Sequence, residues 1–140
     1  MTSFVFNSAL RDEAVGNIDY DTDTFKVMLL TSAASPNKDT WAKRSDVTNE
    51  ATGTGYPAGG AAATVTVGAV DTANDRVEIT LGGAAWAAST ITARYAVYYK
   101  SRGGAATADE LIAVNDFGAD VTSTNGTFTL NASTYRKNNP

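Results

Sequence analysis

Short runs in which apolar and polar residues alternate, bounded by turn residues, constrain this chain more than any other feature. Residues 63–70 alternate threonine with valine, residues 71–75 form a polar turn, and residues 76–81 return with Val77, Ile79 and Leu81 on one face. Such alternation is typical of half-buried strands, so the pair predicts a β-hairpin. Further strands are predicted at residues 25–30, 91–100, 110–117 and 121–130, and Asn125-Gly126 predicts a hairpin turn inside the last run.

One stretch, residues 8–15, favours a helix. Asn7 or Ser8 can cap its N-terminus, Asp12 and Glu13 lie early enough to favour the helix dipole, and Gly16 can end it. A helix of about two turns is too short to be stable alone, so it is expected to be an accessory to the strands.

Seven or eight short strands without a long sequence repeat predict one β domain. We therefore expect residues 1–140 to form a single all-β domain, a jelly-roll-like antiparallel β-sandwich with one short N-terminal helix. The polar tail at residues 136–140 is expected to fray.

Charge and composition exclude several classes of function. The 140 residues include 15 acidic and 11 basic side chains, a net charge of −4, with no cysteine and no histidine. Nucleic-acid binding requires clustered lysine and arginine, so neither nucleic acid nor an anionic membrane is an expected partner. Without imidazole or thiol groups, a Ser-His-Asp triad, a cysteine nucleophile and a Cys₄ zinc site are impossible.

The N-terminal residues contain no positively charged region followed by a long apolar run, so no signal peptide is expected. No stretch reaches the ~20 apolar residues of a membrane helix. The chain is therefore expected to be a soluble protein made in the cytoplasm.

Asp19, Asp21 and Asp23 have the alternating spacing that begins a calcium loop. A complete loop of this kind has glycine at its sixth position and glutamate at its twelfth, where this chain has Thr24 and Leu30. A solvated acidic turn before a strand is the favoured interpretation, and adventitious cation binding is the alternative. No metal or other cofactor is expected.

Two further patterns have an ordinary structural explanation. The glycine-rich residues 53–60 lack the Gly-Lys-Ser/Thr ending of a phosphate loop, and glycines with positive φ explain them better. Paired carboxylates can hydrolyse glycosides, but none of the available ones lies in a recognisable motif. These carboxylates are Asp46, Glu50, Asp109, Glu110 and Asp116. No catalytic residue is assigned, and the chain is not expected to be an enzyme.

Aromatic side chains on a strand can form a sugar-binding platform, a protein interface or part of the core. Tyr95 and Tyr99 share one face of the strand at residues 91–100 and are predicted to be core. Tyr98 lies on the opposite face and, with Trp41, is the predicted interface residue.

Several motifs together resemble one family, the capsid cement (decoration) proteins of short-tailed bacteriophages. They span most of the chain and keep a characteristic order: TFKVMLL at 24–30, RSDVTNE at 44–50, GTGY at 53–56, GG at 59–60, Trp86, ARYAVYY at 93–99 and DFG at 116–118. The resemblance implies a jelly-roll fold and a homodimer at two-fold and local two-fold positions of the head. It supplies no catalytic residues and no contact residues.

The implied function is that of a virion structural protein on the capsid exterior, assembled in the host cytoplasm, that cements neighbouring major capsid protein subunits around the packaged DNA. Two alternatives stay open. A minor tail or fibre-associated module would share such motifs but would be present in few copies per particle. A carbohydrate-binding module would use the aromatic strand and respond to glycans in its fluorescence.

Overall fold

The computed structural model describes residues 3–140 and places eight strands and one α-helix within them. In chain order these elements are β1 (Phe4–Val5), α1 (Asn7–Ala14), β2 (Phe25–Leu30), β3 (Ala61–Ala63), β4 (Val65–Asp71), β5 (Arg76–Leu81), β6 (Ala84–Lys100), β7 (Leu111–Leu130) and β8 (Ser133–Asn138). Two short 3₁₀ turns, η1 (Arg44–Asp46) and η2 (Ala106–Ala108), lie in the connections.

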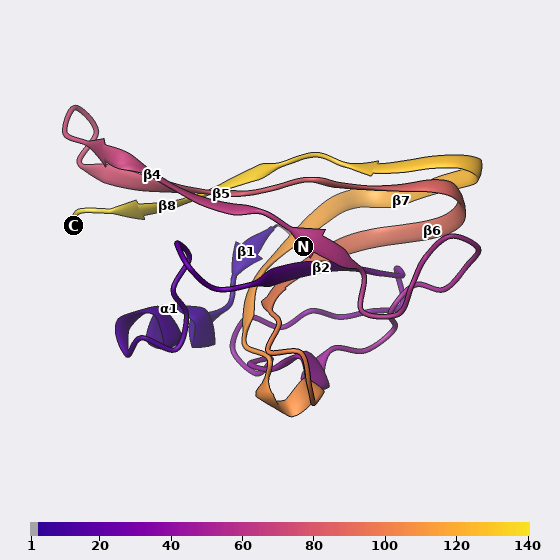
Figure 1. Ribbon diagram of the computed structural model, residues 1–140, viewed down its shortest axis with the longest axis horizontal. Helices are drawn as coiled ribbons and strands as arrows, with labels where there is room; N and C mark the ends of the chain where they lie inside the picture. Colours follow the sequence, from indigo (N-terminus) through magenta and orange to yellow (C-terminus); the bar gives the residue numbers. More distant parts are fainter. Residues whose placement is uncertain (1–2) are drawn as a thin grey trace.

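The strands form two antiparallel sheets. The larger has the order β1-β7-β6-β2-β3 and the smaller has the order β4-β5-β8. The smaller sheet lies across β6 and β7 and continues beyond them toward the side of α1 (Figure 1). This arrangement confirms the predicted all-β sandwich with one short N-terminal helix.

The predicted hairpin is confirmed as β4 and β5. Val65 pairs with Leu81 and Val67 pairs with Ile79. Ile79 and Leu81 are buried, because their shared face is turned toward the larger sheet. The period-two pattern therefore identified both the pairing and the inward face.

The predicted helix is also confirmed, but its start differs from the expectation. Phe6 is the N-cap residue and provides no side-chain cap, while Asn7 donates to Asp39 instead. Asp12 lies outside the first turn and is buried, where its carboxylate accepts a hydrogen bond from Asn17 at 3.0 Å. Gly16 ends the helix as predicted, with a φ of 81°.

The predicted turn at Asn125-Gly126 is wrong, because residues 111–130 form one continuous strand paired with β6. Asn125 has a φ of 46°, and Gly126 lies opposite Ser89 at an irregularity in the ladder. The Ser89 hydroxyl is 2.8 Å from that of Ser123 and 3.1 Å from the carbonyl oxygen of Gly126. A dipeptide that usually makes a turn is here absorbed as a bulge within a long strand.

The prediction of a frayed tail is also wrong for most of its length. Residues 136–138 belong to β8, which pairs with β5 from Ser133 to Asn138. Arg136 lies 3.1 Å from Glu78, and Lys137 lies 2.5 Å from Glu13. Polar composition suggested disorder, but the charges of this segment are matched by carboxylates on its neighbours.

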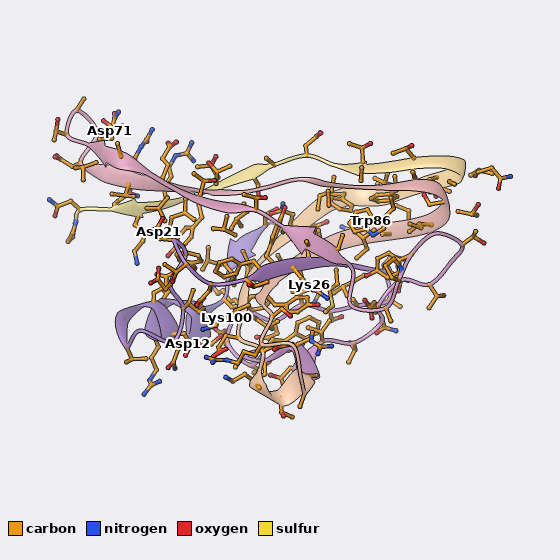
Figure 2. The ribbon with its side chains drawn as sticks, viewed as in Figure 1. Asp12, Asp21, Lys26, Asp71, Trp86 and Lys100 are labelled. Carbon is orange, nitrogen blue, oxygen red and sulfur yellow. The ribbon has the colours of Figure 1, made fainter. Side chains whose placement is uncertain are left out.

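Both faces of the larger sheet are covered. One apolar cluster lies between the two sheets and includes Tyr98 and Trp86. Figure 2 labels Trp86 in this cluster. The second cluster lies on the opposite face, where Tyr95 and Tyr99 pack beneath the N-terminal segment and the loop after β2. Tyr95 and Tyr99 are buried, as predicted.

Gly60 lies directly before β3, where the backbone comes close to β2, and a substitution there tests this close approach. Its φ is 81°, and a methyl group added there would overlap the carbonyl oxygen of Val27. Gly103 has a similar φ of 79° but no neighbouring heavy atom within 4 Å. We expect Gly103→Ala to lower the free energy of unfolding by about 1–2 kcal/mol, through backbone strain alone. Gly60→Ala should lower it by about 1–3 kcal/mol more, because the added methyl group also overlaps its neighbour.

Urea unfolding of both variants beside the parent chain measures these losses. Equal losses of unfolding free energy in Gly60→Ala and Gly103→Ala would contradict the close approach of β3 to β2.

Candidate functional site

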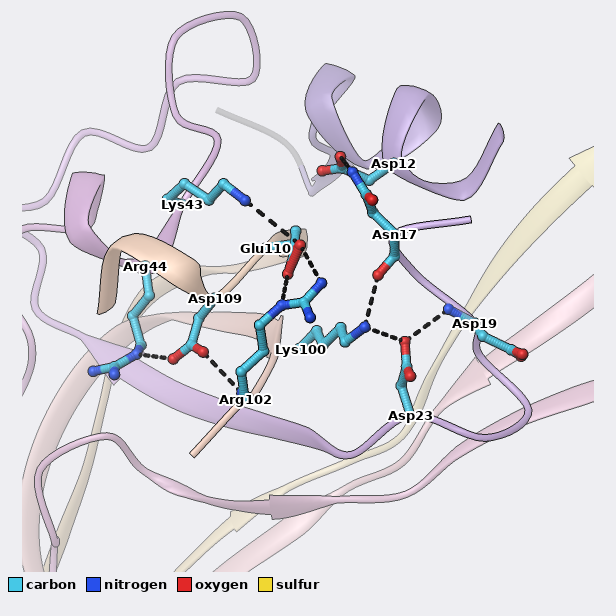
Figure 3. Close-up of polar contacts among 10 residues, drawn as sticks. All are labelled: Asp12, Asn17, Asp19, Asp23, Lys43, Arg44, Lys100, Arg102, Asp109 and Glu110. Atoms are coloured by element: carbon cyan, nitrogen blue, oxygen red, sulfur yellow. Dashed lines mark hydrogen bonds and ion pairs between the residues drawn. The ribbon is translucent and has the colours of Figure 1, made fainter. Parts of the chain in front are cut away.

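The densest group of charged side chains lies where η1 meets the loop that joins β6 to β7 (Figure 3). Arg102 binds Glu110 through two hydrogen bonds, of 2.8 Å from Nε and 2.9 Å from Nη2. Lys43 adds a second cation 3.5 Å from the same carboxylate, and Arg44 contacts Asp109 at 2.7 Å. The carboxylate side chains of Glu110 and Asp109 are only 2% and 1% exposed.

Backbone hydrogen bonds hold this network in place. The backbone N–H of Arg44 donates to the carbonyl of Asp109 at 2.9 Å, and the N–H of Leu111 donates to Ala42 at 3.1 Å. The Asp109 carboxylate also accepts from the backbone N–H of Arg102 at 2.9 Å. Buried carboxylates require such pairing, since an unpaired buried charge is strongly unfavourable. The network therefore fixes the loop of residues 42–46 onto the start of β7.

A second branch joins the acidic turn to β6. Lys100 lies 2.8 Å from Asp23 and donates to the carbonyl of Asn17 at 2.7 Å. Asp19 and Asp21 are exposed, and the N–H of Asp21 donates to the Asp19 carboxylate at 3.0 Å. Within residues 3–140, no three or more Asp, Glu, His or Cys side chains are grouped in a way that could hold a metal ion.

The third polar group connects the helix to the C-terminal strand. Glu13 of α1 accepts hydrogen bonds from the hydroxyls of Tyr20 at 2.5 Å and Tyr135 at 3.2 Å, and from Lys137 at 2.5 Å. Burial, together with the neighbouring Glu13 carboxylate, raises the pKa of Tyr20 far above its ordinary value. The tyrosine therefore stays neutral and acts as a hydrogen-bond donor.

The remaining carboxylates considered for catalysis also hold the fold. Asp46 accepts the backbone N–H groups of residues 42 and 43, and Glu50 accepts from Tyr56 and from the N–H of Gly59. Asp116 lies 3.1 Å from Arg94. Burial alone would raise the pKa of Asp116, but the backbone N–H of Gly118 and the Arg94 guanidinium lower it. Two backbone N–H bonds lower the pKa of Asp46. The contacts of all three carboxylates hold loops and turns in place.

The structure corrects the interface prediction for Tyr98. Its side chain is 0% exposed, and its hydroxyl donates to the carbonyl of Gly82 at 2.8 Å. Tyr98 is inaccessible because β6 is an interior strand covered on both faces. Trp41 is partly buried and stacks on Phe6 with ring centroids 6.3 Å apart, so it presents only part of its surface.

The burial of the aromatic strand also removes the feature that suggested a sugar platform. The exposed apolar side chains lie elsewhere, notably at Val67 and Val70 of β4. Sequence reasoning missed them because it treated the hairpin as half-buried along its whole length. The absence of charge from residues 64–70 is the signal that could have identified an unusual edge strand.

Comparison with known proteins finds no matching family model, no similar curated protein and no similar solved structure. No function is therefore transferred from a relative. Among residues 3–140, no helix has the length and apolar character needed to cross a membrane.

The Glu110 network predicts a pH-dependent stability. Burial alone would raise the pKa of Glu110, but the bonds from Arg102 and the charge of Lys43 lower it below its ordinary value of 4.5. A carboxyl with a lowered folded-state pKa stabilises the fold above its unfolded pKa and loses this contribution as the pH falls through the folded pKa. We expect Glu110→Gln to be less stable than the parent at pH 7, with the difference shrinking below about pH 4.5.

Urea unfolding between pH 7 and pH 3 measures the effect, with Glu78→Gln as a control at a partly exposed ion pair. A difference between parent and Glu110→Gln that is independent of pH would contradict the electrostatic role of the network.

The Glu13 contacts predict a local effect on β8. Glu13→Ala removes the common acceptor of two tyrosines and a lysine. The backbone amides of β8 should therefore exchange hydrogen faster in this variant than in the parent chain, by a larger factor than those of β6. Hydrogen exchange followed by mass spectrometry measures this, with Leu10→Ala, an exposed change on the same helix, as the control. Unchanged exchange in β8 would show that Glu13 does not hold the strand.

Proposed function

We propose that this chain is a virion structural protein of a tailed bacteriophage. It binds the outer surface of the head and cements neighbouring major capsid protein subunits around the packaged DNA. It acts as a homodimer at two-fold and local two-fold positions and carries out no chemical reaction. The proposal starts from the ordered motifs that resemble capsid cement proteins.

The observation that best supports the proposal is that these scattered motifs form one contact network. Tyr56 donates to Glu50 at 2.7 Å and accepts from the backbone N–H of Leu29 at 2.9 Å. Tyr99 donates to the carbonyl of Gly59 at 2.6 Å, and the Arg44 guanidinium lies over the Tyr99 ring, 5.4 Å from its centroid. Residues from five separate motifs thus depend on one another, which explains why their order and spacing would be kept together.

The polar network suits a protein that must transmit force between neighbouring capsid subunits. Asp109, Glu110 and Glu13 tie loops and the terminal strand to the sheets, which restrains these segments. A rigid body transmits force between the subunits it bridges. A dimer that contacts two subunits also gains from effective concentration, so each individual contact needs only modest affinity.

Co-sedimentation with phage heads stripped of this protein tests the proposal. A dimer on every two-fold and local two-fold axis predicts saturation at about one copy per capsid subunit. An acidic protein of similar size serves as the control for nonspecific retention. Failure to bind heads, with the protein recovered only in tail fractions, would contradict the proposal and favour a tail module.

A further inference from the structure

The smaller sheet has an unprotected edge at β4. In the sheet order β4-β5-β8, β5 pairs with one side of β4 and leaves its other side as an outer edge. Within residues 3–140, no backbone hydrogen bond from another segment reaches this outer edge. An edge strand presents unpaired N–H and C=O groups that can pair with another strand.

The other sheet edges carry the protections that natural proteins use. β1 and β3 are only two and three residues long, and β8 carries Arg136 and Lys137. The part of β7 beyond β1 carries Asp116 and Asp120, and its uncharged residues 121–130 contain the bulge at Asn125 and Gly126, which also discourages edge pairing. Short length and charged side chains both discourage pairing between edges.

β4 lacks these protections. It is seven residues long, and its first six residues are uncharged and include no proline. Val67 is 41% exposed and Val70 is 74% exposed, a large exposure for a strand valine. Asp71, the only charge in the strand, stands at its end beside the hairpin tip (Figure 2).

We propose that the outer edge of β4 pairs antiparallel with the same edge of a second copy of this chain. This inference rests on the proposed homodimer and names the surface through which its two copies would meet. A closed two-fold dimer uses the same patch on both subunits, and an uncharged strand can meet its own copy without repulsion. The joint would merge the two smaller sheets into one continuous sheet.

A two-fold axis between Gly68 and Ala69 gives the register that the irregularity in β4 favours. The extra residue between Val67 and Val70 places both valines on the face of their partners Ile79 and Val77. This axis sets Val67 of each copy opposite Val70 of the other, a pair of β-branched side chains that suits neighbouring strands. The two Asp71 carboxylates then lie at opposite ends of the joint, roughly 17 Å apart at about 3.4 Å per residue.

Charge substitutions at this register test the proposal in the absence of heads. Val67→Lys/Val70→Lys places like charges directly opposite each other twice, and should weaken dimerisation roughly tenfold to a hundredfold. Val67→Glu/Val70→Glu should do the same. A mixture of the two variants should form a heterodimer, because each lysine then faces a glutamate.

Sedimentation velocity measures these states, and circular dichroism checks that each variant is folded. Thr124→Lys/Thr127→Lys, at exposed positions of β7, is the matched control and should remain dimeric. A monomeric parent chain, or a dimer unaffected by the β4 charges and not restored by mixing, would overturn the proposal. Head binding by a monomeric parent would leave the cement function standing, so the two failures can be told apart.

Discussion

The pairing of β6 with β7 is the interaction on which the rest of the structure depends. These strands span 17 and 20 residues, far longer than their neighbours, and one face of the ribbon packs against the smaller sheet while the other packs under the loops. Both apolar clusters are built on it. Irregularities such as the one at Ser89 and Gly126 bend the ribbon without ending it, because side-chain hydroxyls satisfy the groups that the ladder leaves unpaired.

Buried carboxylates hold the loops in place, as the β6–β7 ribbon holds the other strands. Asp109 and Glu110 lie just before β7 and form ion pairs with cations at η1 and after β6. Glu13 forms an ion pair with Lys137 of β8. Removing one member of such a pair leaves an unmatched buried charge, which is costly even where the intact pair adds little net stability. These acidic side chains therefore hold the loops and the last strand against the sheets.

Local patterns in the sequence predicted the elements that local forces determine. The β4–β5 hairpin, the strand at Phe25–Leu30 and the end of α1 at Gly16 follow from side-chain alternation and from glycine's access to positive φ. Long-range contacts decided the rest. Asn125-Gly126 became a bulge because β6 continues alongside it, and residues 136–138 became ordered because Glu13 and Glu78 lie within reach. Tyr98 was misplaced because alternation shows two faces but not that both are covered.

We propose that this acidic β body serves as a repeated contact element on a phage head. The most direct test of this proposal is the copy number of the chain in purified phage particles that contain it, measured by quantitative mass spectrometry with isotope-labelled peptides. We expect a constant ratio near one copy per major capsid subunit, retained in heads separated from their tails. A ratio corresponding to only a few copies per particle, confined to tail fractions, would contradict it.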